Sequence, residues 1–130
     1  KNPTLKIKTA KPIIIAGGWK PGCSTDKDAV LLAENFGAKE MLNLSNTEYV
    51  YDKDPNKFSD AKKIEKINWS DFRKNVVGYK WIPGKNVPFD PMASALAEKL
   101  KLKVKILQGT NLVEVKKALQ DKKFKGTVIE

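Results

Sequence analysis

The stretch from residue 11 to residue 36 limits the possible folds of this chain more than any other part of its sequence. It opens with Ile13, Ile14 and Ile15, and a short β-branched apolar run is typical of a strand buried on both faces of a parallel sheet. Gly17 and Gly18 follow, and glycine allows tight turns and a close approach of the backbone to a ligand. The sequence therefore predicts a buried strand that ends in a glycine-rich loop.

A helix is predicted directly after this loop. Ser24, Thr25 and Asp26 are residue types that cap helix N-termini, and Gly37 is a typical C-terminal cap. Between these caps, apolar side chains recur at helical spacing, at Ala29, Val30, Ala33 and Phe36. Because a helix N-terminus presents free N–H groups and a positive dipole end, a strand, a loop and a helix in this order form an anion site.

The loop is therefore predicted to bind phosphate, although it carries neither of two common phosphate-binding patterns. The Walker pattern Gly-x-x-x-x-Gly-Lys-[Ser/Thr] and the dinucleotide pattern Gly-x-Gly-x-x-Gly are both absent. An ordinary strand-to-helix turn uses the same residue types, so the residues alone leave that alternative open.

A second polar loop is predicted beside the first. Residues 39–44, with Met41, Leu42 and Leu44 apolar, are predicted to form a strand, and residues 45–57 follow as a polar loop. A strand, a helix and a second strand in sequence favour a right-handed parallel crossover, which puts both loops at the same end of the sheet. Ligands of α/β sheets bind at this carboxyl end.

The remainder of the chain continues the alternation of helices and strands. Helices are predicted over residues 69–77, 91–100 and 112–119. Extended pieces are predicted over residues 60–67, around Lys63 and Ile64, and over residues 104–107 and 126–129. Ser70 is the expected cap of the first of these helices, and Asp90 followed by Pro91 is a favoured opening for the second. The pattern predicts an α/β layered sheet in one domain, residues 1–130.

The amino-acid composition excludes several classes of protein and of metal site. The chain has 130 residues, 41% of them hydrophobic, which suffices for one domain with a core. Cys23 is the single cysteine and histidine is absent, so we expect no disulfide framework and no metal site of the zinc type. A reduced, cytoplasmic setting follows. No apolar run approaches the ~18 residues of a membrane span, and no signal-peptide pattern is present, so no membrane partner is expected.

The formal net charge of +10 raises the possibility of a nucleic-acid partner. The lysines, however, are scattered between apolar periodic positions, and Arg73 is the only arginine. Bidentate arginine is the preferred reader of base edges, so this composition argues against nucleic acid and favours solvated lysine-rich faces.

Three segments resemble, in order and spacing, one known family: the uridylate (UMP) kinases of the archaeal type within the amino acid kinase superfamily. Residues 17–26 (Gly-Gly-Trp-Lys-Pro-Gly-Cys-Ser-Thr-Asp) are similar to the family's acceptor loop. Residues 45–55 (Ser-Asn-Thr-Glu-Tyr-Val-Tyr-Asp-Lys-Asp-Pro) resemble its Thr-Asn-Val-Asp-Gly-Val-Tyr-x-x-Asp-Pro loop. Residues 84–93 resemble its Gly-x-x-x-x-x-Asp-x-x-Ala segment, and Gly126, Thr127 and Ile129 match its Gly-Thr-x-Ile end.

This resemblance implies a carbamate kinase-like fold, a three-layer αβα sandwich around a mainly parallel sheet. It further implies transfer of the γ-phosphate of ATP to UMP with Mg2+, giving UDP for pyrimidine nucleotide biosynthesis, usually in a homohexamer. The chain corresponds to the carboxy-terminal, nucleotide-binding half of such a kinase, and the expected amino-terminal half, with its phosphate-neutralising lysine, is its partner. Alone, the chain is expected to be inactive. A non-enzymatic member of the fold that binds a nucleotide or oxyanion is the alternative.

The resemblance also assigns roles to individual residues. The UMP-binding set is Trp19, Lys20, Pro21, Gly22, Cys23, Ser24 and Thr25. The ATP-binding set is Ser45, Asn46, Tyr51 and Asp54. Asp26 and Asp90 match acidic positions near the reacting phosphates, although either could be a simple helix cap, and Tyr51 could be a packed loop aromatic. Glu48 and Tyr49 replace the family's Asp-Gly pair, which puts the geometry of the ATP loop in doubt.

Overall fold

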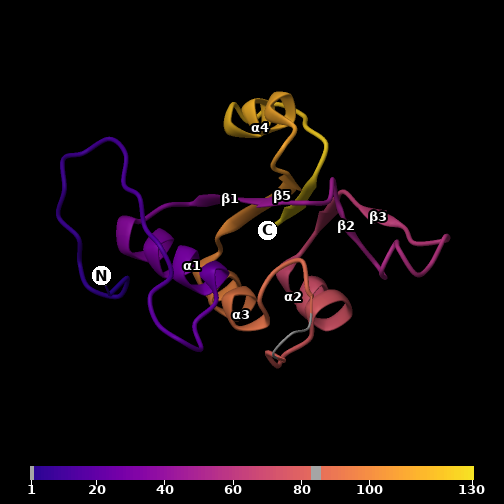
Figure 1. The fold of residues 1–130 in the computed structure, drawn as a ribbon, viewed down its shortest axis with the longest axis horizontal. Helices are drawn as coiled ribbons and strands as arrows, with labels where there is room; N and C mark the ends of the chain where they lie inside the picture. Colours follow the sequence, from indigo (N-terminus) through magenta and orange to yellow (C-terminus); the bar gives the residue numbers. More distant parts are fainter. Residues whose placement is uncertain (1, 83–85) are drawn as a thin grey trace.

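The computed structural model describes residues 2–82 and 86–130 and contains helices on both sides of a small mixed sheet (Figure 1). The helices are α1 (Thr25–Phe36), α2 (Trp69–Phe72), the π-helical turn η1 (Arg73–Val77), α3 (Pro91–Leu100) and α4 (Leu112–Leu119). The strands are β1 (Glu40–Ser45), β2 (Val50–Tyr51), β3 (Lys63–Ile64), β4 (Lys66–Ile67), β5 (Lys103–Gln108) and β6 (Thr127–Ile129). Within the described residues, no helix is both long and apolar enough to cross a membrane.

Helix α1 forms as the sequence predicts. The Ser24 side chain accepts a hydrogen bond from the Lys27 N–H, and Gly37 ends the helix in the left-handed region at φ 66°. The face that carries Val30 and Ala33 is buried, so the apolar spacing of the sequence corresponds to the core-facing stripe.

The four-stranded sheet has the order β1-β5-β6-β4. β1 pairs with β5 in parallel, so that Met41 lies opposite Val104 and Ser45 opposite Gln108. β4 and β6 are also parallel, whereas β5 and β6 are antiparallel. The prediction of a mainly parallel sheet is confirmed, with one antiparallel pairing that the sequence did not indicate. A separate hairpin of β2 and β3 extends away from the sheet (Figure 1).

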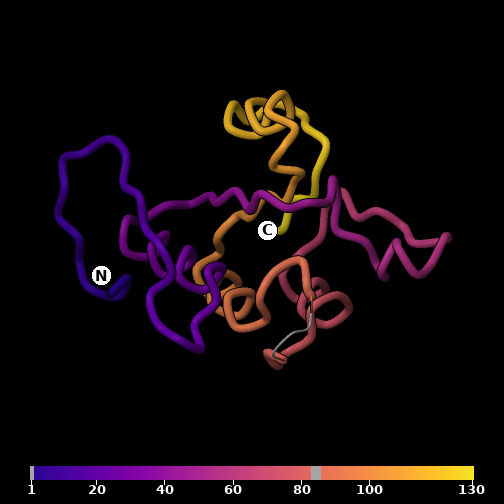
Figure 2. The backbone as a smooth tube through the Cα atoms, in the orientation of Figure 1, coloured from indigo at the N-terminus to yellow at the C-terminus, as the bar shows by residue number. Residues whose placement is uncertain are grey.

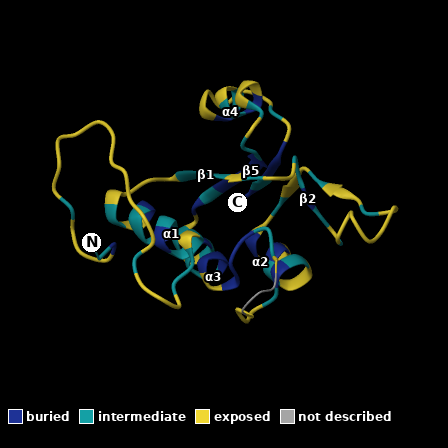
Figure 3. Cartoon of the chain, in the orientation of Figure 1, coloured by how far each residue is buried: buried dark blue, intermediate teal, exposed yellow. Residues whose placement is uncertain are grey.

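The helices form two layers around the sheet. α1, α2 and α3 lie on one side of it and α4 on the other (Figure 1). The core lies mainly between the sheet and the three-helix side, where α2, α3 and the strands turn their buried residues toward one another (Figure 3). Trp69 packs edge-on against Phe72 at a ring-centroid distance of 5.9 Å, and its indole N–H donates to the Leu102 carbonyl at 2.9 Å. The αβα layering expected from the resemblance is therefore present.

The predicted strand at Ile13, Ile14 and Ile15 is wrong for this structure. Residues 11–18 form no strand, and Ile13 and Ile15 expose 78% and 94% of their surface. The N-terminal stretch instead contacts α1 through Asn35, which hydrogen-bonds Pro3 and Ile7, and then forms a wide loop before α1 (Figure 2). A strand needs neighbours to satisfy its backbone groups, and the described sheet offers this segment none.

One smaller prediction also needs correction. Asn68, not Ser70, caps α2, because the Asn68 side chain accepts a hydrogen bond from the Asp71 N–H. The apolar residues Leu112 and Leu119 of α4 are 74% and 67% exposed, so this helix presents a partly apolar face to solvent. Its buried positions are Glu114 and Ala118.

Candidate functional site

A cleft of about 520 Å³ opens at the carboxyl end of β1. Its walls come from four parts of the chain: the first turn of α1, the end of β1 with the loop after it, Val76 of η1, and residues 86–88 before α3. The Asn43 side-chain amide donates to the Pro88 carbonyl at 3.3 Å, which ties the end of β1 to this last wall. The cleft therefore lies where an α/β sheet is expected to bind ligands.

All four residues assigned to ATP line this cleft, together with Asp26. The four are Ser45, Asn46, Tyr51 and Asp54. The two polar loops of the sequence are thus at the same end of the sheet, as predicted, because Asp26 directly follows the first loop.

The loop after β1 is closed by its own hydroxyl groups. The Ser45 hydroxyl accepts from the Thr47 N–H at 3.3 Å, and the Thr47 hydroxyl donates to the Tyr49 carbonyl at 3.2 Å. Among the described residues with positive φ there is none between 45 and 54, so the turn closes without the glycine that Glu48–Tyr49 lacks. The backbone of this loop therefore forms with Glu48 and Tyr49 in place of the family's Asp-Gly pair.

A buried hydroxyl that sequence reasoning missed fixes the far end of this loop. Thr127 of β6 accepts from the Val50 N–H at 2.9 Å and donates to the Ile64 carbonyl. Thr127 is fully buried, so this contact joins the loop to the sheet in a dry environment. The sequence flagged Thr127 only as part of a terminal pattern and gave no sign of its partner.

Asp26 and Asp90 lie against each other. The Asp90 N–H donates to Asp26 Oδ2 at 2.9 Å, while Asp90 Oδ1 accepts from the Ala93 N–H at 2.7 Å as the cap of α3. Burial raises the pKa of Asp26, and the nearby Asp90 charge adds to this rise, while the Asp90 N–H opposes it. The contact brings the N-termini of α1 and α3, two positive dipole ends, together beside the cleft, which Asp26 lines and Asp90 does not.

The segment assigned to UMP lies beside the cleft, but none of its seven residues lines it. Gly22 adopts φ 77°, and the Cys23 N–H donates to the Lys20 carbonyl, which closes a turn. The Ser24 hydroxyl is engaged as the cap of α1. Within the third matched segment, Gly84 and Lys85 lie outside the described residues.

Asp28, which the sequence did not single out, shapes this segment. Its carboxylate is buried and accepts from the Trp19 N–H at 2.8 Å and from the Cys23 thiol at 3.0 Å. The hydrogen bond to Asp28, with burial and the Asp28 charge, raises the pKa of the Cys23 thiol. A polar residue one turn into an amphipathic helix is the signal that could have pointed to it.

The cleft is acidic. Asp26, Asp52 and Asp54 line it, against Lys53 as the one lysine among its described lining residues. Lys53 forms an ion pair with Asp60 at 2.6 Å, which leaves it little charge to offer a ligand. In the part of the chain that the structure describes, no group of three or more His, Cys, Asp or Glu side chains is arranged to hold a metal ion.

Comparison with known proteins gives a consistent result. The family model described as "Amino acid kinase family" matches residues 5–108. The chain is 36% identical over 120 residues to a uridylate kinase of Methanocaldococcus jannaschii, which covers 91% of this chain and 51% of that protein.

Solved structures agree. The crystal structure of uridylate kinase from Archaeoglobus fulgidus matches with a TM-score of 0.68 and 30% identity, covering 88% of this chain and 50% of that one. UMP kinase from Bacillus anthracis matches with a TM-score of 0.71 at 20% identity, covering 85% and 42%, which supports the fold alone. The chain spans about half the length of the curated relatives it matches.

Proposed function

The chain belongs to the amino acid kinase family, and on that premise we propose that the protein containing it transfers the γ-phosphate of ATP to UMP, giving UDP for pyrimidine nucleotide synthesis. The observation that carries the proposal is the gathering of Asp26 with the four candidate ATP residues in one cleft. The similarity to uridylate kinases over 91% of the chain supports it.

On the ATP side, Tyr51 offers an aromatic ring for the adenine and Asp54 a carboxylate for the ribose or base. Ser45 and Asn46 stand at the end of β1 and offer a hydroxyl and an amide to the phosphates. Phosphoryl transfer depends on positioning and charge stabilisation rather than covalent chemistry, and these groups supply positioning.

On the UMP side, residues Trp19 through Thr25 would surround the nucleotide beside the cleft. Asp26 and Asp90 would stand near the reacting phosphates. Asp26 Oδ1 accepts no hydrogen bond from residues 2–82 or 86–130, so this oxygen remains available in the cleft. Asp90 would act together with the converging N–H groups of α1 and α3.

Mg2+ fits this donor set. Mg2+ is usually held by one or two carboxylates plus substrate phosphates and water, and Asp26 offers one free carboxylate oxygen within the cleft. When bound, the ion would neutralise phosphate charge that the acidic cleft cannot.

The excess of carboxylates in the cleft also supports a role for an amino-terminal half that would supply positive charge. No lysine or arginine of the described lining residues is free of an ion pair to face phosphates. β1 is the end strand of the described sheet, and Ile13 and Ile15 are exposed nearby in sequence. We propose that this half supplies the missing cation and covers that apolar surface, in a cytoplasmic protein that assembles as a homo-oligomer, by family a hexamer. Residues 1–130 would then form the nucleotide-holding unit.

The test is a coupled measurement of UDP formation and nucleotide binding with the protein at its full natural length. We expect UDP to form from UMP and MgATP, and residues 1–130 alone to give no turnover. Calorimetric binding of nucleotide without turnover in the full-length protein would instead select the non-enzymatic alternative. Failure to bind ATP at all would refute the assignment of the cleft.

A further inference from the structure

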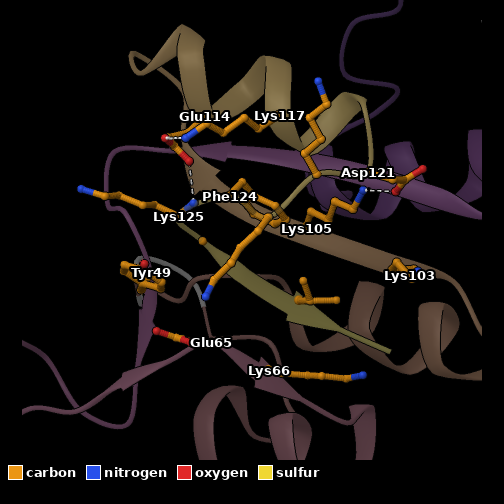
Figure 4. Close-up of a pocket in the computed structure, with 14 residues that line it drawn as sticks. Tyr49, Glu65, Lys66, Lys103, Lys105, Glu114, Lys117, Asp121, Phe124 and Lys125 are labelled. Carbon is orange, nitrogen blue, oxygen red and sulfur yellow. Dashed lines mark hydrogen bonds and ion pairs between the residues drawn. The ribbon is translucent and has the colours of Figure 1, made fainter.

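A second hollow, of about 640 Å³, lies on the α4 side of the sheet (Figure 4). Its walls are α4, the turn after α4, and the strands β5 and β6. Seven lysines line it against three carboxylates, Glu65, Glu114 and Asp121. We call this hollow the lysine pocket.

Four of these lysines are already engaged in ion pairs. Lys105 is buried and contacts Glu40 at 2.6 Å, Asp121 at 2.8 Å and the Ala118 carbonyl at 2.7 Å (Figure 4 shows the Asp121 contact). Lys117 pairs with Glu114 at 2.7 Å. Lys66 and Lys103 share Glu130. These pairs reduce the charge that the four lysines offer a ligand.

The other three lysines are on one turn. Lys122, Lys123 and Lys125 form no ion pair with any carboxylate of residues 2–82 or 86–130. They stand within four consecutive positions between α4 and β6. Three ammonium groups are therefore available at the wall of one hollow.

This turn is held in place at both ends. At its start, Asp121 is fixed by Lys105, and at its end the Lys125 N–H donates to the buried Glu114 carboxylate at 2.7 Å (Figure 4). Phe124 lies so close over Gly126 that an added Cβ there would stand 2.4 Å from the ring and 2.7 Å from the Ile106 carbonyl. A turn anchored in this way presents its lysines with little ordering left to be done on binding.

We propose that the lysine pocket binds an oligophosphate, an anion of three or more linked phosphates, free or as part of a nucleotide. The three available ammonium groups match the charge of such a chain, and the volume is that of a small-ligand site. The site goes beyond the proposed kinase activity and does not depend on it.

The charge of the pocket favours phosphate as the group recognised, and both aromatic rings at its wall already have a lysine nearby. The Lys105 ammonium lies 5.9 Å from the Phe124 ring centroid, and the Lys63 ammonium lies 4.8 Å from that of Tyr49. Each ring thus already has a cation on one face. The three available lysines are confined to four positions of one turn, which suits a short anion better than an extended polyanion such as RNA.

The test uses the full-length protein, with sodium tripolyphosphate as the probe and ATP as the second arm. Amide chemical shifts are followed while each is added at fixed ionic strength. We expect tripolyphosphate to perturb residues 122–128 and leave Tyr51 and Asp54 unchanged, and ATP to perturb both regions. If the two probes bind at residues 122–128 with equal affinity, the phosphate chain determines the binding. A much higher affinity for ATP than for tripolyphosphate would overturn recognition of phosphate alone.

A charge-matched pair of variants separates a site from general attraction. Lys122→Gln, Lys123→Gln and Lys125→Gln together should weaken tripolyphosphate binding by about ten-fold or more. Lys6→Gln, Lys8→Gln and Lys11→Gln remove the same charge from an exposed segment and should change binding less than about two-fold. Equal losses in both variants, no shifts at residues 122–128, or tighter binding of single-stranded RNA than of tripolyphosphate would overturn the proposal.

Discussion

The cleft at the end of β1 and the lysine pocket beneath α4 are of similar size, about 520 Å³ and 640 Å³, but opposite in charge. Three carboxylates and one paired lysine line the cleft, whereas seven lysines and three carboxylates line the pocket. Tyr49 borders both. A net charge of +10 therefore says little about where a nucleotide binds, because the lysines are concentrated away from the proposed catalytic cleft.

Under the two proposals, the regions would hold phosphate in different ways. The cleft offers helix N-termini, hydroxyls and carboxylates, so its charge balance depends on cations that arrive from elsewhere. The pocket offers ammonium groups already in place. Catalysis needs charge stabilisation that is strongest in the transition state, whereas binding alone does not. This difference favours catalysis in the cleft and ligand binding without reaction in the pocket.

The largest expected effect tests whether the cleft, and not the lysine pocket, is the catalytic region. Asp26→Asn or Asp90→Asn should lower kcat in the full-length protein by roughly a hundred-fold or more, because the proposal gives Asp26 the role of a Mg2+ ligand and places Asp90 beside the transferred phosphate. Asparagine is as good a helix cap as aspartate, so Asp90→Asn should leave α3 intact. Steady-state kinetics with thermal melts separate the two effects. Glu34→Gln, exposed on α1, is the matched control, and near-normal turnover in both aspartate variants would refute their roles.

The next effect tests the aromatic side of the cleft. Tyr51→Ala should raise KM for ATP roughly ten-fold, since stacking of a base on an aromatic ring contributes on the order of 1–3 kcal/mol. KM for UMP and tripolyphosphate binding at the lysine pocket should stay the same. Tyr51→Phe keeps the ring, and Tyr79→Ala removes an exposed tyrosine elsewhere. An unchanged KM for ATP in Tyr51→Ala would mean that this ring only packs.

The third effect tests the hydrogen bonds of Thr127, which join the cleft loop at Val50 to strand β6. Thr127→Val removes the hydroxyl that contacts the Val50 N–H and the Ile64 carbonyl, leaving two buried groups without it. We expect a loss of about 1–3 kcal/mol in the free energy of unfolding, measured by denaturant titration. Thr127→Ser retains the hydroxyl and should recover most of this loss. Equal stability of the valine and serine variants would contradict the structural role of the bond.

A smaller effect concerns the segment beside the cleft. Asp28→Asn replaces the carboxylate whose hydrogen bond, together with its charge, raises the pKa of the Cys23 thiol, so that pKa should fall. The thiol should then react faster with a disulfide reagent at neutral pH, while KM for UMP rises a few-fold as the turn loosens. Cys23→Ser provides the baseline for the reagent. If the reaction rate does not change, Asp28 has no influence on the thiol.

The smallest expected effect is a pH-dependent gain in stability. Burial raises the pKa of Asp26 in the folded state, so above the ordinary aspartate pKa the folded protein carries a charge it disfavours. Asp26→Asn avoids this cost and can still accept from the Asp90 N–H. Its Tm should exceed that of the wild type by a few degrees at neutral pH. The difference should shrink as pH falls to the ordinary value and vanish below it; a constant difference at all pH values would contradict this cause.

Local signals in the sequence predicted much of the fold. The Ser24 and Gly37 caps, the Asp90–Pro91 opening of α3 and the apolar strand β5 depend on neighbouring residues, and each is present. Ile13, Ile14 and Ile15 depend instead on sheet neighbours, which local sequence does not reveal and which the described sheet does not offer them. These three residues favour a strand by their type, but the strand does not form because no neighbouring strand of the described sheet pairs with them.

The candidate site divides in the same way. The loop that carries Ser45 and Tyr51 was found from its motif, and its closeness to Asp26 from the order of the elements. Asp28 and Thr127 were missed, because their partners lie 9 and 77 residues away in the chain. Likewise, no sequence pattern distinguished the three available lysines from those already paired.

The most direct measurement is a crystal structure of the full-length protein with UMP and a non-hydrolysable ATP analogue. The adenine should lie against Tyr51, with the terminal phosphates directed at Asp26 and Asp90 and UMP beside residues 19–25. A nucleotide base bound in the lysine pocket, with the cleft at β1 empty, would contradict the division of roles between the two regions.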